Sequence, residues 1–343
     1  MSEPLLEVRN LVIRFPIWGG VLRHKVAEVR AVDDVSFTIH QGETLGLVGE
    51  SGCGKTTTAK AICNVLKETA VGVHQQGEII FHSERGPVDL LSLSRSQMKP
   101  YRREIQMIFQ DPFSSLNPRM TVGEIIGRPL KVHSRLTGKG RRDEVASLLE
   151  RVGLQSGYAS RYPHEFSGGQ RQRIGIARAL AVRPKLVIAD EPVSALDVSV
   201  QSQVINLLQD LQDELNLTYL FVAHDLSVVH HISDRIAVMY LGDLVEIGPA
   251  ETVYHHPAHP YSRALLSAVL EPDPSGDRKQ RVKLKGEIPS PLDKPSGCSF
   301  HPRCPIARPA CSEARPSLER KPNGQLAACP YADEPVAEAV EKR

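Results

Sequence analysis

The feature that most constrains this chain is a glycine-rich turn between a short apolar run and a helix-forming run. Residues 44–48 are almost wholly apolar, as expected of a central parallel strand that is covered on both faces. The turn reads Gly49-Glu50-Ser51-Gly52-Cys53-Gly54-Lys55-Thr56-Thr57, and a helix is expected to begin near Thr56. A strand, a glycine-rich turn and a helix in this order predict an α/β fold with a phosphate site at the start of the helix.

The residue types in this turn suit a phosphate ligand. Glycines let successive backbone amides converge on phosphate oxygens, Lys55 neutralises charge on the β- and γ-phosphates, and the Thr56 hydroxyl can ligate Mg2+. The alternative is a turn whose glycines serve only its dihedral angles, but this would leave the Gly-Lys-Thr ending unexplained. Cys53 is interpreted as a small loop residue.

A second chemical element is the apolar run 186–189, which ends in the adjacent carboxylates Asp190 and Glu191. Side chains alternate along a strand, so the two carboxylates are expected to point in different directions. We assign Asp190 to Mg2+, held through water, and Glu191 to the general base that activates the attacking water. Two solvated acids at a polar turn are the alternative.

A third element precedes the helix-forming run 171–180 and consists of Ser167, Gly168, Gly169 and Gln170. A serine and two glycines at a helix start offer a hydroxyl and exposed amides to a second anion. A plain capped helix start would show the same pattern, so this element taken alone leaves both interpretations open.

Hydrophobic periodicity places these elements in an alternating α/β pattern. Alternating strands are expected at 5–15 and 32–39 with a loop between them, further strand pattern at 77–91 and 219–223, and a hairpin over 236–247 around Gly242-Asp243. Helical periodicity dominates residues 94–162, and a helical crossover is expected at 200–215. The predicted fold is a P-loop cassette with a parallel-sheet core, an antiparallel β subdomain and an inserted helical subdomain at about 94–180.

Together these motifs resemble the ATP-binding cassette (ABC) family of ATPases. The resemblance spans about residues 5–248, and it rests on the order of the glycine-rich turn, Gln110, the segment 167–170, the paired carboxylates, the segment 194–197 and His224. It implies that ATP is held between the glycine-rich turn of one chain and the segment 167–170 of another in a head-to-tail dimer. A complete site would therefore need a second ATPase chain.

The same resemblance gives roles to single residues. Gln110 would contact Mg2+ and couple to the membrane subunits, Asp197 would organise the dimer contact, and His224 would sense the γ-phosphate. Without the resemblance, Gln110 would be interpreted as a surface glutamine and His224 as a core histidine. Phe15 lies where the family places an aromatic ring that stacks on adenine; a core phenylalanine is the alternative, and Trp18 is a competitor.

The composition changes near residue 255, where prolines become dense and apolar periodicity thins. We therefore predict an ATPase domain at 1–254 and a C-terminal extension at 255–343, with a helix at 261–270, a linker at 272–295 and one possible strand at 282–284. The segments 256–266, 286–292 and 297–305 resemble the C-terminal extension of the oligopeptide/dipeptide (peptide/nickel) branch of the family, as do Gly49 to Gly52 and residues 117–119.

Four of the six cysteines lie in this extension: Cys298, Cys304, Cys311 and Cys329. Their spacings fit neither a paired zinc motif nor a ferredoxin run. The hypothesis is a structural [4Fe–4S] cluster, with zinc or unligated core cysteines as alternatives; a metal would order a segment that is poor in apolar residues. Cys63 is expected to be a plain core residue.

Charge and hydropathy narrow the function. The 42 basic and 40 acidic side chains nearly cancel, so no global field points to nucleic acid. No secretory pattern and no apolar run of roughly 20 residues is present, so we expect a soluble chain that is peripheral at the cytoplasmic face of the cell (inner) membrane.

The resemblance implies an ATP hydrolase that energises the import of dipeptides or oligopeptides. Its partners would be a second, related ATPase chain, two integral-membrane permeases and an extracytoplasmic solute-binding protein. The same role for nickel, glutathione or another small solute is the alternative. A soluble ABC ATPase of translation or DNA repair is disfavoured, because the chain has one cassette and no sustained heptad run.

Overall fold

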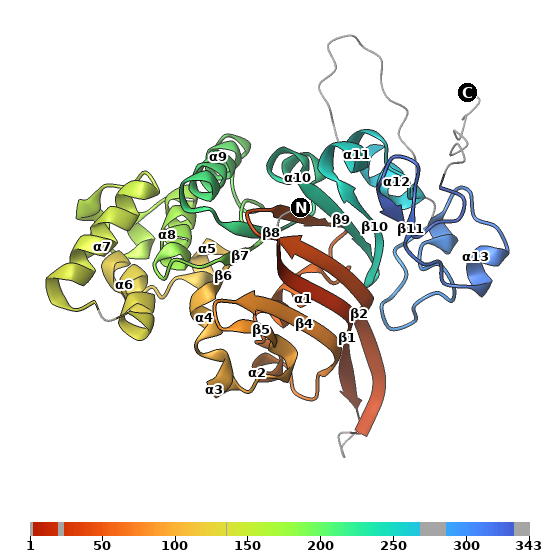
Figure 1. Cartoon of the computed structure of the whole chain (residues 1–343), viewed down its shortest axis with the longest axis horizontal. Coiled ribbons are helices and arrows are strands. Elements are labelled where there is room, and N and C mark those ends of the chain that lie inside the picture. The colour runs from red at the N-terminus through yellow and green to blue at the C-terminus, as the bar shows by residue number, and fades with distance from the viewer. Residues whose placement is uncertain (1–2, 20–23, 135, 268–285, 333–343) are drawn as a thin grey trace, which may run out of the picture. The chain divides into compact units, whose positions relative to one another are not determined.

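The computed structural model describes residues 3–19, 24–134, 136–267 and 286–332 (Figure 1). The chain divides into two compact units, each assembled from separate stretches of sequence. Unit 1 comprises Met1–Leu6, Ile39–Thr44 and Phe81–Val222, and unit 2 comprises Glu7–Thr38, Leu45–Ile80 and Ala223–Arg343.

Unit 1 is built on three parallel strands in the order β8-β7-β6, namely β8 (Thr218–Ala223), β7 (Leu186–Asp190) and β6 (Ile105–Ile108). Every residue of β7 and β8 is buried, as their apolar sequences predicted. The strand β6 lies in a stretch that was predicted to be helical, and that part of the prediction was wrong. Four residues are too few to show a period, so only the pairing with β7 reveals the strand.

Helices make up most of the rest of unit 1. Those of the inserted region, α6, α7 and α8, pack on one another and α8 also packs on α9 (Figure 1). The elements are β5 (Gly86–Asp89), α3 (Arg95–Met98), α4 (Tyr101–Glu104), α5 (Pro112–Ser115), α6 (Val122–His133), α7 (Gly138–Arg151), α8 (Gly168–Leu180) and α9 (Val198–Leu215), with 3-10 turns at Leu90–Ser92, Ser156–Ser160 and Pro163–Glu165.

Unit 2 contains an antiparallel set in the order β2-β1-β4, with β1 (Pro4–Gly19), β2 (His24–His40) and β4 (His74–Ser83). Both β1 and β2 continue into the region that was predicted to be a loop. Pro16 lies within β1, because its fixed φ is compatible with an extended strand and costs only one N–H donor.

A second set of strands in unit 2 pairs β3 (Thr44–Val48) in parallel with β9 (Arg235–Tyr240), and β9 in antiparallel with β10 (Asp243–Pro249). The predicted hairpin is confirmed. Its turn residues Leu241 and Gly242 have φ values of 43° and 83°, as a turn with two positive φ angles requires.

The extension joins this sheet, because β12 (Leu326–Ala327) pairs with β10 and β11 (Glu319–Arg320) pairs with β12. The helices of unit 2 are α1 (Lys55–Ile62), α2 (Leu66–Thr69), α10 (Leu226–Ile232), α11 (Ala250–His255), α12 (Pro260–Ser267) and α13 (Ala310–Glu313), and a 3-10 turn spans His301–Arg303.

Some predicted elements of the extension lie outside the described residues: the strand at 282–284, the end of the helix at 261–270 and most of the linker. The domain boundary at residue 255 stays a prediction. None of the helices in the described ranges is long and apolar enough to span a membrane.

Candidate functional site

The glycine-rich turn, called the P-loop from here on (residues 49–57), folds tightly between β3 and α1. Gly54 has a φ of 109°, and a Cβ there would lie 2.2 Å from the carbonyl oxygen of Ala31. A Cβ on Gly49 would lie 2.1 Å from the carbonyl oxygen of Met239. Side chains are therefore excluded at both positions, and the backbone can lie where only glycine permits it.

Lys55 is 4% exposed, and its ammonium group lies inside the P-loop. Nζ donates to the carbonyl oxygens of Gly49 at 2.7 Å and Glu50 at 3.1 Å. The charge is thus held at the start of α1, where phosphate oxygens would meet both the amides of the helix start and a cation. Cys53 is buried beside it, and burial raises the pKa of its thiol, so it is a protonated small residue.

The paired carboxylates differ in burial and in backbone conformation. Asp190 is 3% exposed at the end of β7. Glu191 has a φ of 47°, and its N–H donates to the carbonyl of Val222 at 2.9 Å. Glu191 thus has a left-handed backbone conformation just after β7, so the simple alternation of a strand ends before it.

Unit 1 also brings together two residues that the sequence suggested separately. Nε2 of Gln110 donates to Oε2 of Glu191 at 2.9 Å, so the glutamine just after β6 orients the proposed general base at the end of β7. The neighbouring strand order β7-β6 explains this meeting, because the carboxyl ends of parallel strands lie at one edge of a sheet.

Ser167 begins α8 with a reciprocal cap. Its Oγ accepts the N–H of Gln170 at 3.3 Å, while Oε1 of Gln170 accepts the N–H of Ser167 at 3.0 Å. A Cβ on Gly169 would lie 2.5 Å from Cγ1 of Val200, so this glycine permits the close approach of α8 and α9. The capped helix start is therefore present, and it presents Gly168 and Gly169 in its first turn, as a second anion site would need.

His224 is exposed directly after β8, so the alternative of a core histidine was wrong. The Asp225 side chain caps α10 next to it by accepting the N–H of Ser227 at 2.9 Å. In β1, Phe15 is partly buried and Trp18 is 50% exposed. The adenine-stacking role of Phe15 remains a prediction.

The four clustered cysteines line one cavity of about 210 Å³ in the extension, together with Phe300. None of them is in a disulfide. The pKa of Cys298 is raised to about 11 and that of Cys304 to about 12, mainly by burial and in smaller part by the neighbouring thiols. Clustered, half-buried cysteine sulfurs are a type of ligand set that a thiophilic cation prefers.

The spacing of the sulfur atoms bears on the kind of metal. In the described part of the chain, no three of these sulfurs have all mutual distances within 4.8 Å. A tetrahedral zinc ion, with Zn–S bonds of about 2.3 Å, would bring four sulfurs to roughly 3.8 Å from one another. The four sulfurs of the described structure are therefore not drawn together as they would be around one zinc ion.

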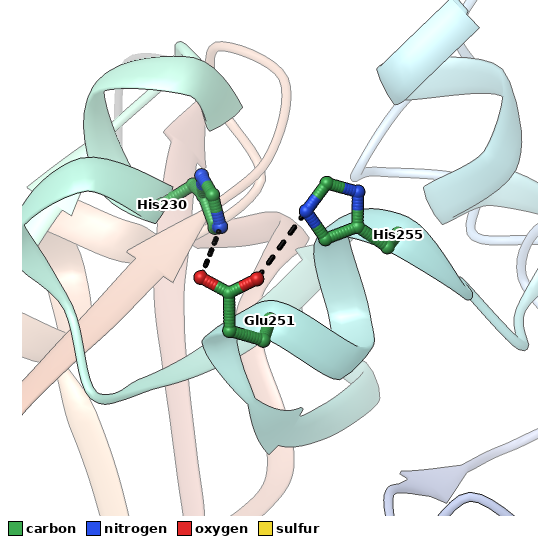
Figure 2. A group of neighbouring side chains, drawn as sticks. All are labelled: His230, Glu251 and His255. Atoms are coloured by element: carbon green, nitrogen blue, oxygen red, sulfur yellow. Dashed lines mark hydrogen bonds and ion pairs between the residues drawn. The ribbon is translucent and has the colours of Figure 1, made fainter.

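One set of metal-ligating groups does meet that distance limit, and Figure 2 shows it: His230 on α10 with Glu251 and His255 on α11. The two Nε2 atoms lie 3.1 Å and 3.3 Å from the carboxylate oxygens of Glu251. Glu251 and His255 are largely exposed. The sequence did not single out this set, because its members lie on separate helices.

The structure also places two residues of the extension on the P-loop that the sequence did not identify. Arg303 forms an ion pair with Glu50, and the hydroxyl of Tyr261 accepts the N–H of Glu50. Arg303 stands 253 positions from Glu50. In the sequence, Arg303 is only one residue of the segment 297–305 that resembles the oligopeptide/dipeptide branch. No local pattern predicts a contact over such a separation.

Comparisons with known proteins agree with the motifs. Residues 32–194 match the family model described as ABC transporter, and residues 245–311 match the one described as oligopeptide/dipeptide transporter, C-terminal region. The chain is 51% identical over 330 residues to the oligopeptide transport ATP-binding protein AppF of Bacillus subtilis, covering 96% of this chain and 97% of that protein. It is 55% identical over 289 residues to the glutathione import ATP-binding protein GsiA of Escherichia coli, covering 84% of this chain and 45% of that protein.

Among solved structures, the dimeric post-hydrolysis state of the ATP-binding cassette MJ0796 bound to ADP and Pi is similar. It is 27% identical in sequence, has a TM-score of 0.60, and covers 71% of this chain and 98% of its own. The predicted α/β cassette fold is confirmed by this likeness. The chain belongs to the ABC transporter family, in the branch whose members carry the oligopeptide/dipeptide transporter C-terminal region.

Proposed function

We propose that this chain is the ATP-hydrolysing subunit of an importer of oligopeptides or dipeptides, bound peripherally at the cytoplasmic face of the membrane. The observation that carries the proposal is the presence in one chain of an ordered P-loop and of an extension matching the oligopeptide/dipeptide transporter region. The partners proposed are a second, related ATPase chain, two permeases and an extracytoplasmic solute-binding protein.

We propose a division of labour among these side chains. Lys55 and the amides at the start of α1 bind the β- and γ-phosphates. Glu191, oriented by Gln110, takes the proton of the water that attacks the γ-phosphorus, so that the bond to the β-phosphate oxygen breaks and ADP and phosphate leave. His224 contacts the γ-phosphate from the end of β8.

Thr56, Gln110 and Asp190 supply the hydroxyl, amide and carboxylate oxygens that Mg2+ prefers, so the residues present fit this ion. When bound, Mg2+ would neutralise charge that develops on the phosphates. Each complete site would combine the P-loop, residues 49–57, of one chain with the segment 167–170 of a second chain. A head-to-tail arrangement is proposed because each chain supplies one of each.

The import role is tested by uptake in cells that lack their own oligopeptide ATPase subunit. We expect the wild-type chain to restore uptake of a labelled tripeptide and Lys55→Ala to fail, because the variant loses the cation that binds phosphate. Lys60→Ala, which removes a lysine from the same helix outside the P-loop, is the control. Restored uptake of glutathione without that of tripeptides would favour the alternative substrate, which the similarity to GsiA makes the second candidate.

For the four cysteines we propose a [4Fe–4S] cluster, with zinc as the alternative. The cavity of about 210 Å³ that all four cysteines line supports the larger group. When bound, it would supply ordering energy to a proline-rich segment. Iron, sulfide and zinc contents of anaerobically purified protein test this, and stoichiometric zinc without sulfide would contradict it.

The zinc measurement needs a control because His230, Glu251 and His255 could also take up zinc from the buffer (Figure 2). The measurement is therefore repeated on His255→Ala. Zinc that persists in this variant and disappears in Cys304→Ser belongs to the cysteines, whereas zinc lost in His255→Ala belongs to the surface set.

A further inference from the structure

A largely buried ion pair joins the extension to the P-loop. In Arg303, Nη1 lies 2.9 Å from Oε2 of Glu50 and Nη2 lies 3.2 Å from Oε1, which is the two-pronged geometry of a guanidinium on a carboxylate. The side chain of Arg303 is only 8% exposed and that of Glu50 25%. The pair is therefore far less screened by water than a surface ion pair.

A second contact reaches the same P-loop residue through its backbone. The N–H of Glu50 donates to the hydroxyl of Tyr261 at 2.9 Å, and Tyr261 has 0% of its surface exposed. Tyr240 joins the two contacts, since its ring lies 4.7 Å from that of Tyr261 and its hydroxyl accepts from Nη1 of Arg303 at 3.3 Å. Both the side chain and the amide of Glu50 are thus held by residues outside the P-loop.

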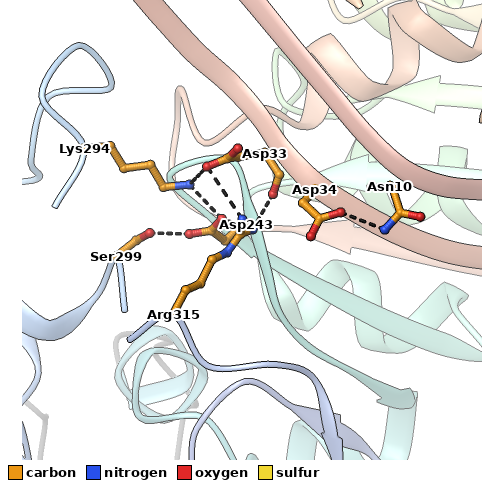
Figure 3. A network of polar contacts seen from close by, with 7 residues as sticks. All are labelled: Asn10, Asp33, Asp34, Asp243, Lys294, Ser299 and Arg315. Atoms are coloured by element: carbon orange, nitrogen blue, oxygen red, sulfur yellow. Dashed lines mark hydrogen bonds and ion pairs between the residues drawn. The ribbon is translucent and has the colours of Figure 1, made fainter. Parts of the chain in front are cut away.

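The segment that carries Arg303 is itself anchored, as Figure 3 shows. Lys294, 6% exposed, lies 2.8 Å from a carboxylate oxygen of Asp33 and 2.7 Å from one of Asp243. Arg315 adds a 2.6 Å contact to Asp243, and the hydroxyl of Ser299 donates to the other oxygen of the same carboxylate. Lys294 and Arg315, which lie on either side of Arg303 in the sequence, therefore fix the extension to β2 and to the start of β10.

We propose that Arg303 and Tyr261 are positioning residues for ATP: they hold Glu50, and through it the P-loop backbone, in the conformation that receives the phosphates. The C-terminal extension is then a part of the nucleotide site of its own chain. This inference rests on the proposed assignment of residues 49–57 as the nucleotide site.

The physical reason lies in the flexibility of the P-loop. Three glycines in six residues give it many accessible backbone conformations, and ordering it on binding costs conformational entropy. Fixing Glu50 beforehand removes part of that cost from the binding step. The carbonyl of Glu50 also accepts from Lys55, so a displaced Glu50 would disturb the lysine that binds the phosphates.

The decisive test uses conservative variants of the full chain. Arg303→Lys keeps the charge but cannot form two parallel bonds to one carboxylate. Tyr261→Phe keeps the buried ring and removes only the acceptor of the Glu50 N–H. We expect each to raise the dissociation constant of ATP, by roughly tenfold for Arg303→Lys, as loss of a charge-assisted hydrogen bond does, and to raise the KM for ATP more than it lowers kcat.

Two matched controls separate positioning from general stability. Arg151→Lys weakens an ion pair with Glu214 that involves neither the extension nor the P-loop, and Tyr219→Phe removes a buried hydroxyl that donates to the carbonyl of Leu208. Both should bind ATP within about twofold of the wild type. If they weaken binding as much as the test variants, the pair is only a structural anchor and the proposal is overturned.

A double variant closes the test. If Arg303 acts through Glu50, Glu50→Gln with Arg303→Lys should bind ATP no more weakly than the worse single variant. Additive losses would contradict the proposal. Lys55→Ala keeps the two inferences apart: unchanged ATP affinity in that variant would refute the P-loop assignment, whereas unchanged affinity in Arg303→Lys and Tyr261→Phe would refute only the positioning role.

Discussion

Glu191 leaves β7 with a φ of 47°, a conformation that costs free energy in any residue other than glycine. The cost is offset locally, because its N–H donates to Val222 and its side chain accepts from Gln110. Such strain at the end of a central strand is typical of functional positions.

Glu191→Gln is expected to leave ATP binding nearly unchanged and to lower kcat by about 100- to 10,000-fold, since an amide cannot take a proton from water. Single-turnover hydrolysis and ATP affinity would both be measured. Glu150→Gln, which changes an exposed glutamate of α7, is the control and should keep wild-type turnover. Near-native turnover in Glu191→Gln would refute its role as the base.

His259 gives a second prediction, on pH. Its ring is buried, and burial lowers its pKa to about 3, with Arg263 adding to the shift. Nδ1 accepts the N–H of Tyr261 at 3.1 Å, which a protonated ring cannot do. Because the folded pKa lies below the unfolded value of about 6.5, the stabilisation is complete above pH ~6.5 and is lost as the pH falls toward 3.

The free energy of unfolding should therefore fall with pH below 6.5, with a contribution from His259 of up to ~1.4 kcal/mol per pH unit. His259→Asn, whose amide oxygen can accept the same bond, should remove this contribution. His256→Asn changes an exposed histidine nearby in sequence and should retain it. Equal slopes in wild type and His259→Asn between pH 6.5 and 5 would contradict the prediction.

Among the elements, α7 and α8 offer a direct comparison of helix starts. Ser167 caps α8 with its side chain, whereas Thr137 occupies the same position of α7 and its side chain makes no capping bond. Ser167→Ala should lower the free energy of unfolding by about 0.5–2 kcal/mol and Thr137→Ala by less than about 0.5 kcal/mol. Urea unfolding measures both, and equal losses would mean that the cap contributes nothing.

Strands were predicted correctly where a local apolar pattern was clear, and they were missed where the strand forms only by pairing with a neighbouring strand. β3, β7 and β8 were evident because continuous apolar runs between polar turns favour buried strands. β6 was missed, since its four residues become a strand only by pairing with β7. The ends of β1 and β2 extend into the predicted loop for the same reason: neighbouring strands supply hydrogen bonds that local sequence does not report.

For the molecule as a whole, the metal and nucleotide proposals make a joint prediction. Removing the proposed metal, or Cys304→Ser, should loosen the segment around Arg303. ATP binding should then weaken several-fold, even though Cys304 is not a residue of the P-loop. In Arg303→Lys the same treatment should change ATP affinity little, because the connection is already broken. Cys63→Ser, which changes a cysteine outside the cavity, should keep both the metal and the affinity.

By itself, the sequence determined the chemistry and the family. The P-loop, the paired carboxylates and the segment 167–170 are local motifs, and each needs only a few consecutive residues to be recognised. The cysteines of the extension were also evident, because clustered thiols without an export pattern require an explanation.

Only the tertiary structure decided which distant residues meet. Gln110 reaches Glu191 because two strands pair, and Arg303 reaches Glu50 because the extension joins the sheet through β12 and is anchored by charge on Asp33 and Asp243. Such contacts join positions far apart in the chain. The Gln110–Glu191 bond is exposed and follows from the strand pairing, whereas the Arg303–Glu50 pair is stabilised by burial that limits its contact with water. No local pattern encodes that burial, since it exists only once the whole chain has folded.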